Sequence, residues 1–150
     1  MNEEDVRATL AKSPLLEDLD PTALMFLVRL GHRRTYKPGD VLMRQGEPSN
    51  SIHFLLSGKV RAERSRRTDD RPLLLADLEA GAVVGEMGVV IDIPRSATVI
   101  ATKPTSTLEL DTASFERAAR AFPILHRVLA KLLSERLRRT SERVGDDRRG

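Results

Sequence analysis

The spacing of hydrophobic positions divides the chain into three stretches. Apolar residues recur at helical intervals over residues 1–30, form short alternating runs over 31–110, and return to helical intervals over 111–145. Helical spacing marks an amphipathic helix, whereas alternation over about four to eight residues marks a strand with one buried face. The pattern therefore predicts a mainly β fold with helices before and after it.

The first stretch predicts two helices. Asn2 can cap a helix that carries Val6 and Leu10 one turn apart. Asp20 and Pro21 mark the start of a second helix, because Asp is a good cap and proline fits the first helical position. The buried face of this second helix is expected to consist of Leu24, Leu27 and Val28.

The middle stretch predicts a small antiparallel barrel or sandwich. Turn-forming residues punctuate it at positions 38–40, 46–48, 57–59, 81 and 85. Two runs, 52–56 and 97–101, alternate as strands with one buried face should. The polar residues 64–72 are expected to form an exposed hairpin loop, with a DNA-backbone contact as the alternative.

The last stretch predicts two further helices. Asp111 or Thr112 can cap the first of them, and a longer helix enters at Phe122 and Pro123. The longer helix carries an apolar stripe with the three-four spacing by which two helices bury a shared seam. The stripe consists of Ala130, Leu133, Leu137, Thr140 and Val144. It predicts a homodimer through the C-terminal helix, or packing of that helix against the chain's own barrel.

Composition excludes several classes of function. The chain has no cysteine and three histidines, so a disulfide framework, a thiolate nucleophile and a metal centre are all disfavoured. No apolar run approaches the roughly 20 residues that a bilayer crossing needs. No nucleophile with an adjacent base and no paired carboxylates emerge either. We therefore expect one cytoplasmic domain, 1–150, with no enzyme activity, no cofactor and no membrane contact.

The net charge of +3 is small enough for ordinary solvated arginines to explain it. Arginines cluster within residues 64–71 and 136–149, which leaves direct DNA or RNA binding as an alternative. Aromatic residues make up only 3% of the chain, however, and stacking on single-stranded nucleic acid needs aromatic faces. The sequence thus argues against nucleic acid as a partner of this chain alone.

Residues 84–97 carry the chemistry that matters most. Gly85 and Gly88 allow a close approach of backbone to a ligand, and residues 86–91 can form one helical turn whose N–H groups face an anion. Arg95 supplies a permanent cation with a fork of donors suited to phosphate. Glu86 suits sugar hydroxyls, which a carboxylate binds strongly. On residues alone, a tight glycine turn with a surface arginine is the alternative.

This segment resembles the phosphate-binding cassette of the cyclic nucleotide-binding domain family. Gly85-Glu86-Met87-Gly88 is followed, eight residues after Glu86, by Pro94-Arg95-Ser96-Ala97-Thr98-Val99. The resemblance covers essentially the whole chain and implies an eight-stranded antiparallel jelly-roll barrel with N-terminal helices and a long C-terminal helix. Val84 stands where the family often has Phe, and Gly88 where it often has Ala; neither change removes a donor.

The resemblance implies a set of binding residues. The glutamate would hold the ribose 2′-hydroxyl, and the arginine with the backbone amides would hold the cyclic phosphate. Gly88 and Ser96 both resemble the residues at these positions in the catabolite activator branch. In that branch the serine hydroxyl adds a contact to the phosphate. The implied cassette residues are Gly85, Glu86, Met87, Gly88, Val89, Arg95, Ser96 and Ala97.

The end of the chain resembles the same branch. Thr140 and Ser141, 45 residues after Arg95, match a Thr-Ser pair that reaches the adenine from the partner protomer's helix. The alternative is a polar seam residue beside a solvated one. The sequence stops five residues after Gly145, before the helix-turn-helix of that branch. We therefore expect either a truncated sensor half of a transcription regulator or a stand-alone sensor.

Together these features predict a regulatory domain that senses cyclic AMP, with cyclic GMP as the other candidate ligand, and signals through its C-terminal helix to a downstream protein. The second hypothesis is a dimerisation or protein-interaction module with a vestigial pocket. Intact Glu86, Arg95 and Ser96 argue against that second hypothesis.

Overall fold

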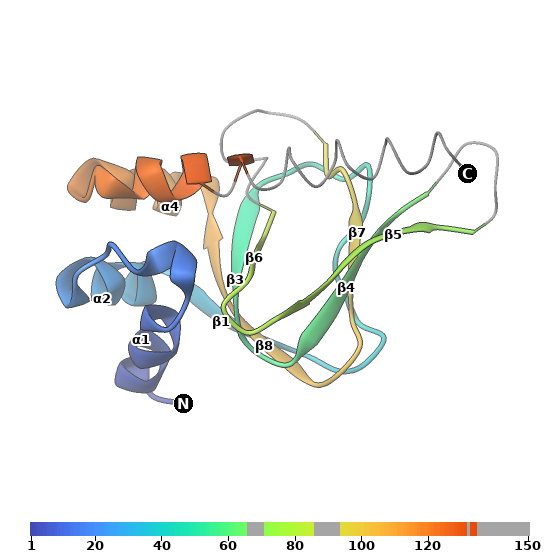
Figure 1. Ribbon diagram of the computed structural model, residues 1–150, viewed down its shortest axis with the longest axis horizontal. Helices are drawn as coiled ribbons and strands as arrows, with labels where there is room; N and C mark the ends of the chain where they lie inside the picture. Colours follow the sequence, from blue (N-terminus) through green and yellow to red (C-terminus); the bar gives the residue numbers. More distant parts are fainter. Residues whose placement is uncertain (66–70, 86–93, 132, 135–150) are drawn as a thin grey trace.

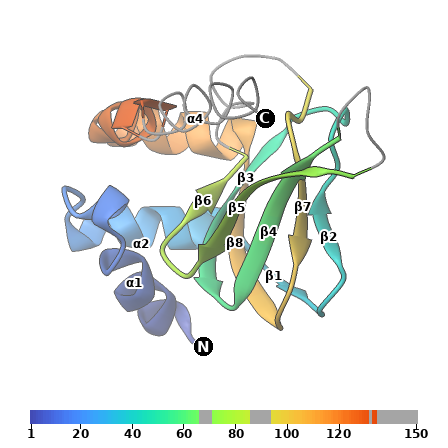
Figure 2. The same ribbon diagram turned by 45° about the vertical axis from the view of Figure 1, so that its right-hand side comes forward.

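Two four-stranded antiparallel sheets face each other, and helices cover the outer side of one of them (Figures 1 and 2). The structure is a computed structural model that describes residues 1–65, 71–85, 94–131, 133 and 134. The first sheet contains, in spatial order, β1 (His32–Tyr36), β8 (Thr105–Asp111), β3 (Ser51–Ser57) and β6 (Val83–Val84). The second contains β2 (Val41–Met43), β7 (Thr98–Ala101), β4 (Lys59–Arg64) and β5 (Leu73–Glu79).

This arrangement confirms the predicted fold class of eight antiparallel strands with flanking helices. The chain crosses between the sheets at every step except the β4–β5 hairpin, and β3 pairs with β8 in one sheet while β4 pairs with β7 in the other, as in a jelly roll. Among the described residues the strands make two separate sheets, not one closed ring. The candidate site lies where the start of β3, the end of β2 and the end of β8 come together.

The helices begin where the sequence predicts. α1 (Glu3–Ala11) is capped by Asn2, whose side chain accepts from the Asp5 N–H. α2 (Pro21–Leu30) is capped by Asp20. A short 3₁₀ helix, η1 (Pro14–Leu16), joins them. The predicted apolar faces are buried, and they consist of Val6 and Leu10 on α1 and Leu24, Leu27 and Val28 on α2.

α4 (Thr112–Ala121) follows β8 directly. Of the two expected caps, Asp111 is the one used, since its side chain accepts from the Ser114 N–H. Residues 124–131 continue as a helix after Pro123 and bury Leu125 against α2 and α4. Phe26 and Phe122 meet edge to face, with ring centroids 5.4 Å apart, which fixes the two helices at this corner.

Strand β3 differs from its prediction. Alternation in residues 52–56 predicted one buried face, but six of the seven residues of β3 are buried. Ile52, Phe54 and Leu56 pack beneath the helices, while Leu55 and His53 point between the sheets. The strand is buried on both faces because the first sheet is the middle layer of three. β7 matches its prediction better, with Val99 and Ala101 buried.

The predicted turn at residues 57–59 joins β3 to β4. Gly58 has φ of +92°, and a Cβ there would lie 2.3 Å from the Pro104 carbonyl oxygen. Glycine is thus required both by the backbone conformation and by the neighbouring chain. β4 and β5 pair as the predicted hairpin, whose tip, residues 66–70, lies outside the described residues.

Within the part of the chain that the structure describes, no helix is long and apolar enough to span a bilayer. The predicted seam of the C-terminal helix is described only at Ala130 and Leu133. Ala130 is exposed and Leu133 is half-buried against the helical cluster. The remaining seam positions, Leu137, Thr140 and Val144, lie outside the described residues.

Candidate nucleotide site

Arg95 lies in the segment that leads into β7 and is held there by its backbone. Its N–H donates to the Glu47 carbonyl at 2.7 Å, and its own carbonyl accepts from the Gly46 N–H at 2.9 Å. A further bridge joins Pro94 to Pro48. Both partners belong to the loop between β2 and β3, so this loop fixes the point from which the Arg95 side chain starts.

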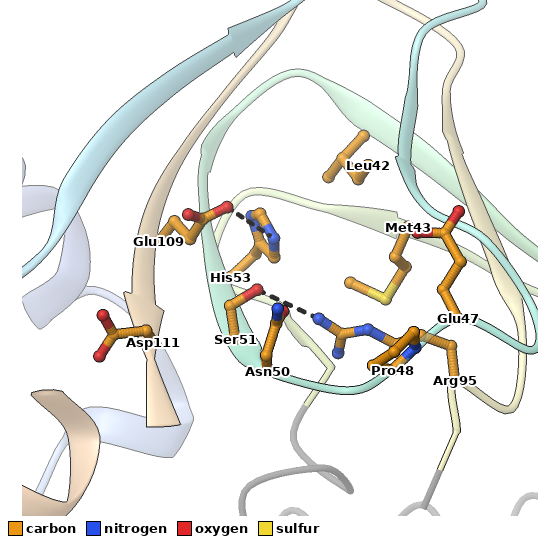
Figure 3. Close-up of a pocket in the computed structure, with 10 residues that line it drawn as sticks. All are labelled: Leu42, Met43, Glu47, Pro48, Asn50, Ser51, His53, Arg95, Glu109 and Asp111. Atoms are coloured by element: carbon orange, nitrogen blue, oxygen red, sulfur yellow. Dashed lines mark hydrogen bonds and ion pairs between the residues drawn. The ribbon is translucent and has the colours of Figure 1, made fainter. Parts of the chain in front are cut away.

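The Arg95 side chain turns inward, and the residue as a whole is only 7% exposed. Its Nη2 donates to Ser51 Oγ at 3.1 Å, and its Nη1 donates to the Gly85 carbonyl at 3.4 Å (Figure 3). Ser51 opens β3 and Gly85 follows β6. Three segments that are distant in sequence therefore meet at one cation.

Gly85 packs directly against that cation. Its φ is +85°, and a Cβ built on it would lie 2.6 Å from Arg95 Nη1 and 2.8 Å from the Ser51 carbonyl oxygen. Both the conformation and the lack of space exclude a side chain at this position. The glycine that the sequence marked as permitting a close approach thus permits the approach of the arginine.

A cavity of about 380 Å³ opens beside the guanidinium, at the end of the two-sheet layer. Figure 3 shows Arg95 and Glu47 on one side of it, with Glu109 and Asp111 on the other side and His53 and Ser51 between them. Its lining residues are Leu42, Met43, Glu47, Pro48, Asn50, Ser51, His53, Arg95, Glu109 and Asp111. The cavity is therefore polar and contains both signs of charge.

His53 forms part of the cavity wall and is 2% exposed. Its Nε2 lies 3.3 Å from Glu109 Oε2, and its Nδ1 lies 3.2 Å from Thr107 Oγ1. Burial, opposed by the Glu109 carboxylate and assisted by the charges of Arg95 and Arg34, lowers the pKa of His53 to about 4. At neutral pH this imidazole is uncharged, and Arg95 is the cation of the buried wall.

The acidic residues of the wall have partners of their own. Glu109 Oε1 lies 3.5 Å from Arg34, and Glu47 lies 3.8 Å from Arg44. Asp111 accepts from the Ser114 N–H, which lowers the pKa of its carboxyl. These contacts offset part of the negative charge that would otherwise repel an anion at the guanidinium.

Half of the predicted cassette falls within the described residues. Gly85 and Arg95 are brought together; Ser96 is exposed and Ala97 half-buried on the way into β7. The other predicted binding residues lie outside the described residues, namely Glu86, Met87, Gly88, Val89, Thr140 and Ser141. The ligand-binding role of every residue in the set remains a prediction.

Sequence reasoning did not single out Ser51, His53 or Glu109 as site residues. The available signal was the alternation of β3, which places Ser51, His53 and Leu55 on one face. That alternation shows which side chains share one face of β3, but it does not show which other segments this face contacts. The contact with Arg95 arises from the pairing of the β2–β3 loop with Pro94, which no local pattern indicates.

Comparison with known proteins decides the family. The model of the cyclic nucleotide-binding domain matches residues 33–122, which include β1 through α4 and the Gly85–Arg95 contact. The chain belongs to the cyclic nucleotide-binding domain family. The resemblance drawn from the cassette residues is thereby confirmed, and a cyclic nucleotide is the class of ligand that the family binds.

Relatives of this cyclic nucleotide-binding domain include a channel and a receptor protein. A cyclic nucleotide-gated potassium channel of Mesorhizobium japonicum is 32% identical over 84% of this chain and 33% of its own length. The cyclic AMP receptor protein of Thermus thermophilus is 32% identical over 84% of this chain and 58% of its own length. This chain spans a third or less of the first curated relatives that it matches.

The solved catabolite activator protein of Thermus thermophilus has the same fold. It superimposes with a TM-score of 0.81 at 30% identity, over 89% of this chain and 62% of the other. This solved protein is a member of the activator branch that the cassette of our chain resembles. The likeness covers about nine-tenths of this chain.

Proposed function

We propose that this domain senses cyclic AMP and performs no catalysis itself. The observation that carries the proposal is the buried Arg95 guanidinium held against Gly85, inside the region that matches the family. A buried arginine with a planar fork of donors, next to backbone that a ligand can approach closely, suits a phosphate diester. Glu86 would hold the ribose, as the cassette resemblance implies.

Cyclic AMP is favoured over cyclic GMP by the C-terminal residues. Thr140 and Ser141 match the pair that, in the activator branch, reaches adenine from the partner protomer. The cyclic AMP receptor protein among the relatives supports the same choice. In this proposal one protomer's sheets hold phosphate and ribose, and the partner's helix closes over the base.

The proposed output is a shift between two states of the C-terminal helix. Ligand bound at the cassette favours the state in which the helix is docked over the base, since only that state adds the helix contacts. The docked helix then presents a different surface to a downstream protein. The domain would work in the cytoplasm, where cyclic nucleotides are signals.

Arg95→Ala tests the assignment. Loss of a charge-assisted contact to phosphate should weaken cyclic AMP binding by about 30- to 1000-fold, measured by isothermal titration calorimetry. Arg61→Ala is the matched control, because Arg61 is an exposed arginine of β4 that lies 3.5 Å from Asp77, and neither residue lines the cavity. It should leave the dissociation constant within about twofold.

Two results would reject the proposal. Unchanged cyclic AMP affinity in Arg95→Ala would remove the phosphate role of this residue. A wild-type chain that binds neither cyclic AMP nor cyclic GMP, in calorimetry and in a thermal-shift titration, would favour an interaction module with a vestigial pocket. Tighter binding of cyclic GMP than of cyclic AMP would retain the sensor and reject its proposed ligand.

A further inference from the structure

Ser51 is the first residue of β3, and its side chain points between the sheets toward Arg95 (Figure 3). Both residues are more than nine-tenths buried, and Ser51 Oγ lies 3.1 Å from Arg95 Nη2. The contact spans 44 positions of sequence. It therefore joins the segment before β7 to the strand at the centre of the first sheet.

The site of Ser51 is rigid. Its backbone pairs with Asp111 at the end of β8, and the next residue back, Asn50, accepts a hydrogen bond at 3.0 Å from the Thr112 N–H at the start of α4. A hydroxyl attached to this junction has a defined position. An arginine side chain, in contrast, carries about 2 kcal/mol of rotamer entropy that binding must overcome.

The chemistry of a hydroxyl suits this place. Serine accepts a hydrogen bond from the guanidinium without a negative charge of its own, so this contact does not reduce the attraction of the cation for an anion. A carboxylate would form a stronger pair and compete with phosphate. The carboxylates of the same wall are engaged elsewhere: Glu109 contacts His53 and Arg34, and Glu47 contacts Arg44.

We infer that Ser51 is a positioning residue of the nucleotide site, whose hydroxyl holds the Arg95 guanidinium in the orientation that meets the cyclic phosphate. The inference rests on the proposed function. Together with the Gly85 carbonyl, Ser51 Oγ fixes the plane of the fork from two sides. A guanidinium already oriented in the free protein loses less entropy when phosphate arrives, which raises affinity.

Calorimetry with cyclic AMP on Ser51→Ala tests this role. Because a hydrogen bond to a charged group contributes substantially to binding, the loss of the Ser51 hydroxyl should lower the affinity for cyclic AMP roughly 10-fold. Ser51→Thr keeps the hydroxyl and should bind within about threefold of wild type. Ser57→Ala is the matched control, because it makes the same change at the exposed end of the same strand, where Ser57 contacts Ser106 instead.

A second background separates positioning from general packing. Arg95→Lys keeps the charge but loses the fork of donors. Adding Ser51→Ala to Arg95→Lys should therefore lower the affinity for cyclic AMP by at most about twofold, whereas Ser51→Ala alone should lower it roughly tenfold. Equal losses in both backgrounds would show that the hydroxyl does not act through Arg95. Ser51→Cys, which keeps the size but is a poor acceptor, replaces Ser51→Ala if that variant does not fold.

The outcomes distinguish this inference from the proposed function. A wild-type chain that binds no cyclic nucleotide rejects both. A wild-type chain that binds cyclic AMP, with Ser51→Ala equal to it, rejects the positioning role alone. The role is also rejected if Ser51→Thr is as weak as Ser51→Ala, or if Ser57→Ala weakens binding equally.

Discussion

At the scale of single residues, the candidate site is defined by what surrounds one buried cation. Arg95 reaches the interior because Gly85 leaves space for it and Ser51 accepts from it. His53 lies on the same wall and stays neutral through burial, which leaves the arginine as the positive group. The sequence identified Gly85 and Arg95 from spacing, but not their mutual contact.

Gly85→Ala should weaken cyclic AMP binding by at least roughly tenfold, because the new methyl group displaces the guanidinium that lies 2.6 Å from the Cβ position. Gly39→Ala is the control, since Gly39 has the same left-handed backbone, with φ of +92° and open space around it. Gly39→Ala should lose about 1–2 kcal/mol of unfolding free energy in urea, and Gly85→Ala should lose more, because its Cβ would also lie 2.8 Å from the Ser51 carbonyl oxygen. If they bind equally well, the contact between Gly85 and Arg95 is irrelevant to the ligand.

The buried His53 predicts an acid-sensitive fold. Its pKa is about 4 in the folded chain and about 6.5 when exposed, so the unfolded state binds more protons between these values. Unfolding free energy should therefore fall by about 3 kcal/mol on this account as pH drops from 6.5 to 4. Among the described residues, Glu109, Arg34 and Arg95 act on the charge of His53, and the Tyr36 ring packs against it.

Urea titrations at pH 7 and pH 4.5 measure the effect. His53→Gln has no imidazole to protonate, so its unfolding free energy should decline less over this window than that of wild type. His126→Gln removes an exposed histidine of the C-terminal helical segment and should follow the wild-type decline. Parallel declines in all three proteins would contradict the role given to His53 burial.

At the scale of elements, local chemistry predicted the ends of helices better than the faces of strands. Asn2, Asp20 and Asp111 cap their helices as expected, because a capping side chain acts only within its own turn. β3 was expected to bury one face but buries both. Which faces a strand buries depends on the layers around it, and that is a property of the assembled sheets.

The same reason explains why Ser51 and Glu109 were missed. Ser51 begins β3 and Glu109 lies within β8; both are ordinary polar residues, and each gains its place only when β3 pairs with β8. Arg95 was recognised because the cassette spacing around it is distinctive. Residues that act through pairing across the sheet carry no comparable mark in the sequence.

At the scale of the whole molecule, the helices and the site share the first sheet. α2, α4 and the helical residues 124–131 bury Leu108 and Leu110 of β8 on one side, and Glu109 of the same strand faces the cavity on the other. Asn50, beside Ser51, accepts from the first residue of α4. The site and the helical cluster are thus joined through β3 and β8.

The proposed dimer can be tested by measuring its mass. Light scattering of the 16.7 kDa chain with cyclic AMP should report twice that mass, because the sequence-predicted seam of the C-terminal helix would pair two protomers. Leu137→Glu places a charge in that seam, so it should yield a monomer. It should also weaken cyclic AMP binding, since a monomer lacks the partner's Thr140 and Ser141 over the base.

Ser134→Glu provides the comparison, because it adds the same charge on the same helix at an exposed position outside the seam. It should preserve both the dimeric mass and the affinity. A wild-type chain with the mass of one protomer at saturating cyclic AMP would reject the shared seam. In that case the affinity of Leu137→Glu would show whether the helix closes over the base of its own protomer: a loss of binding without a change of mass requires such a contact within one chain.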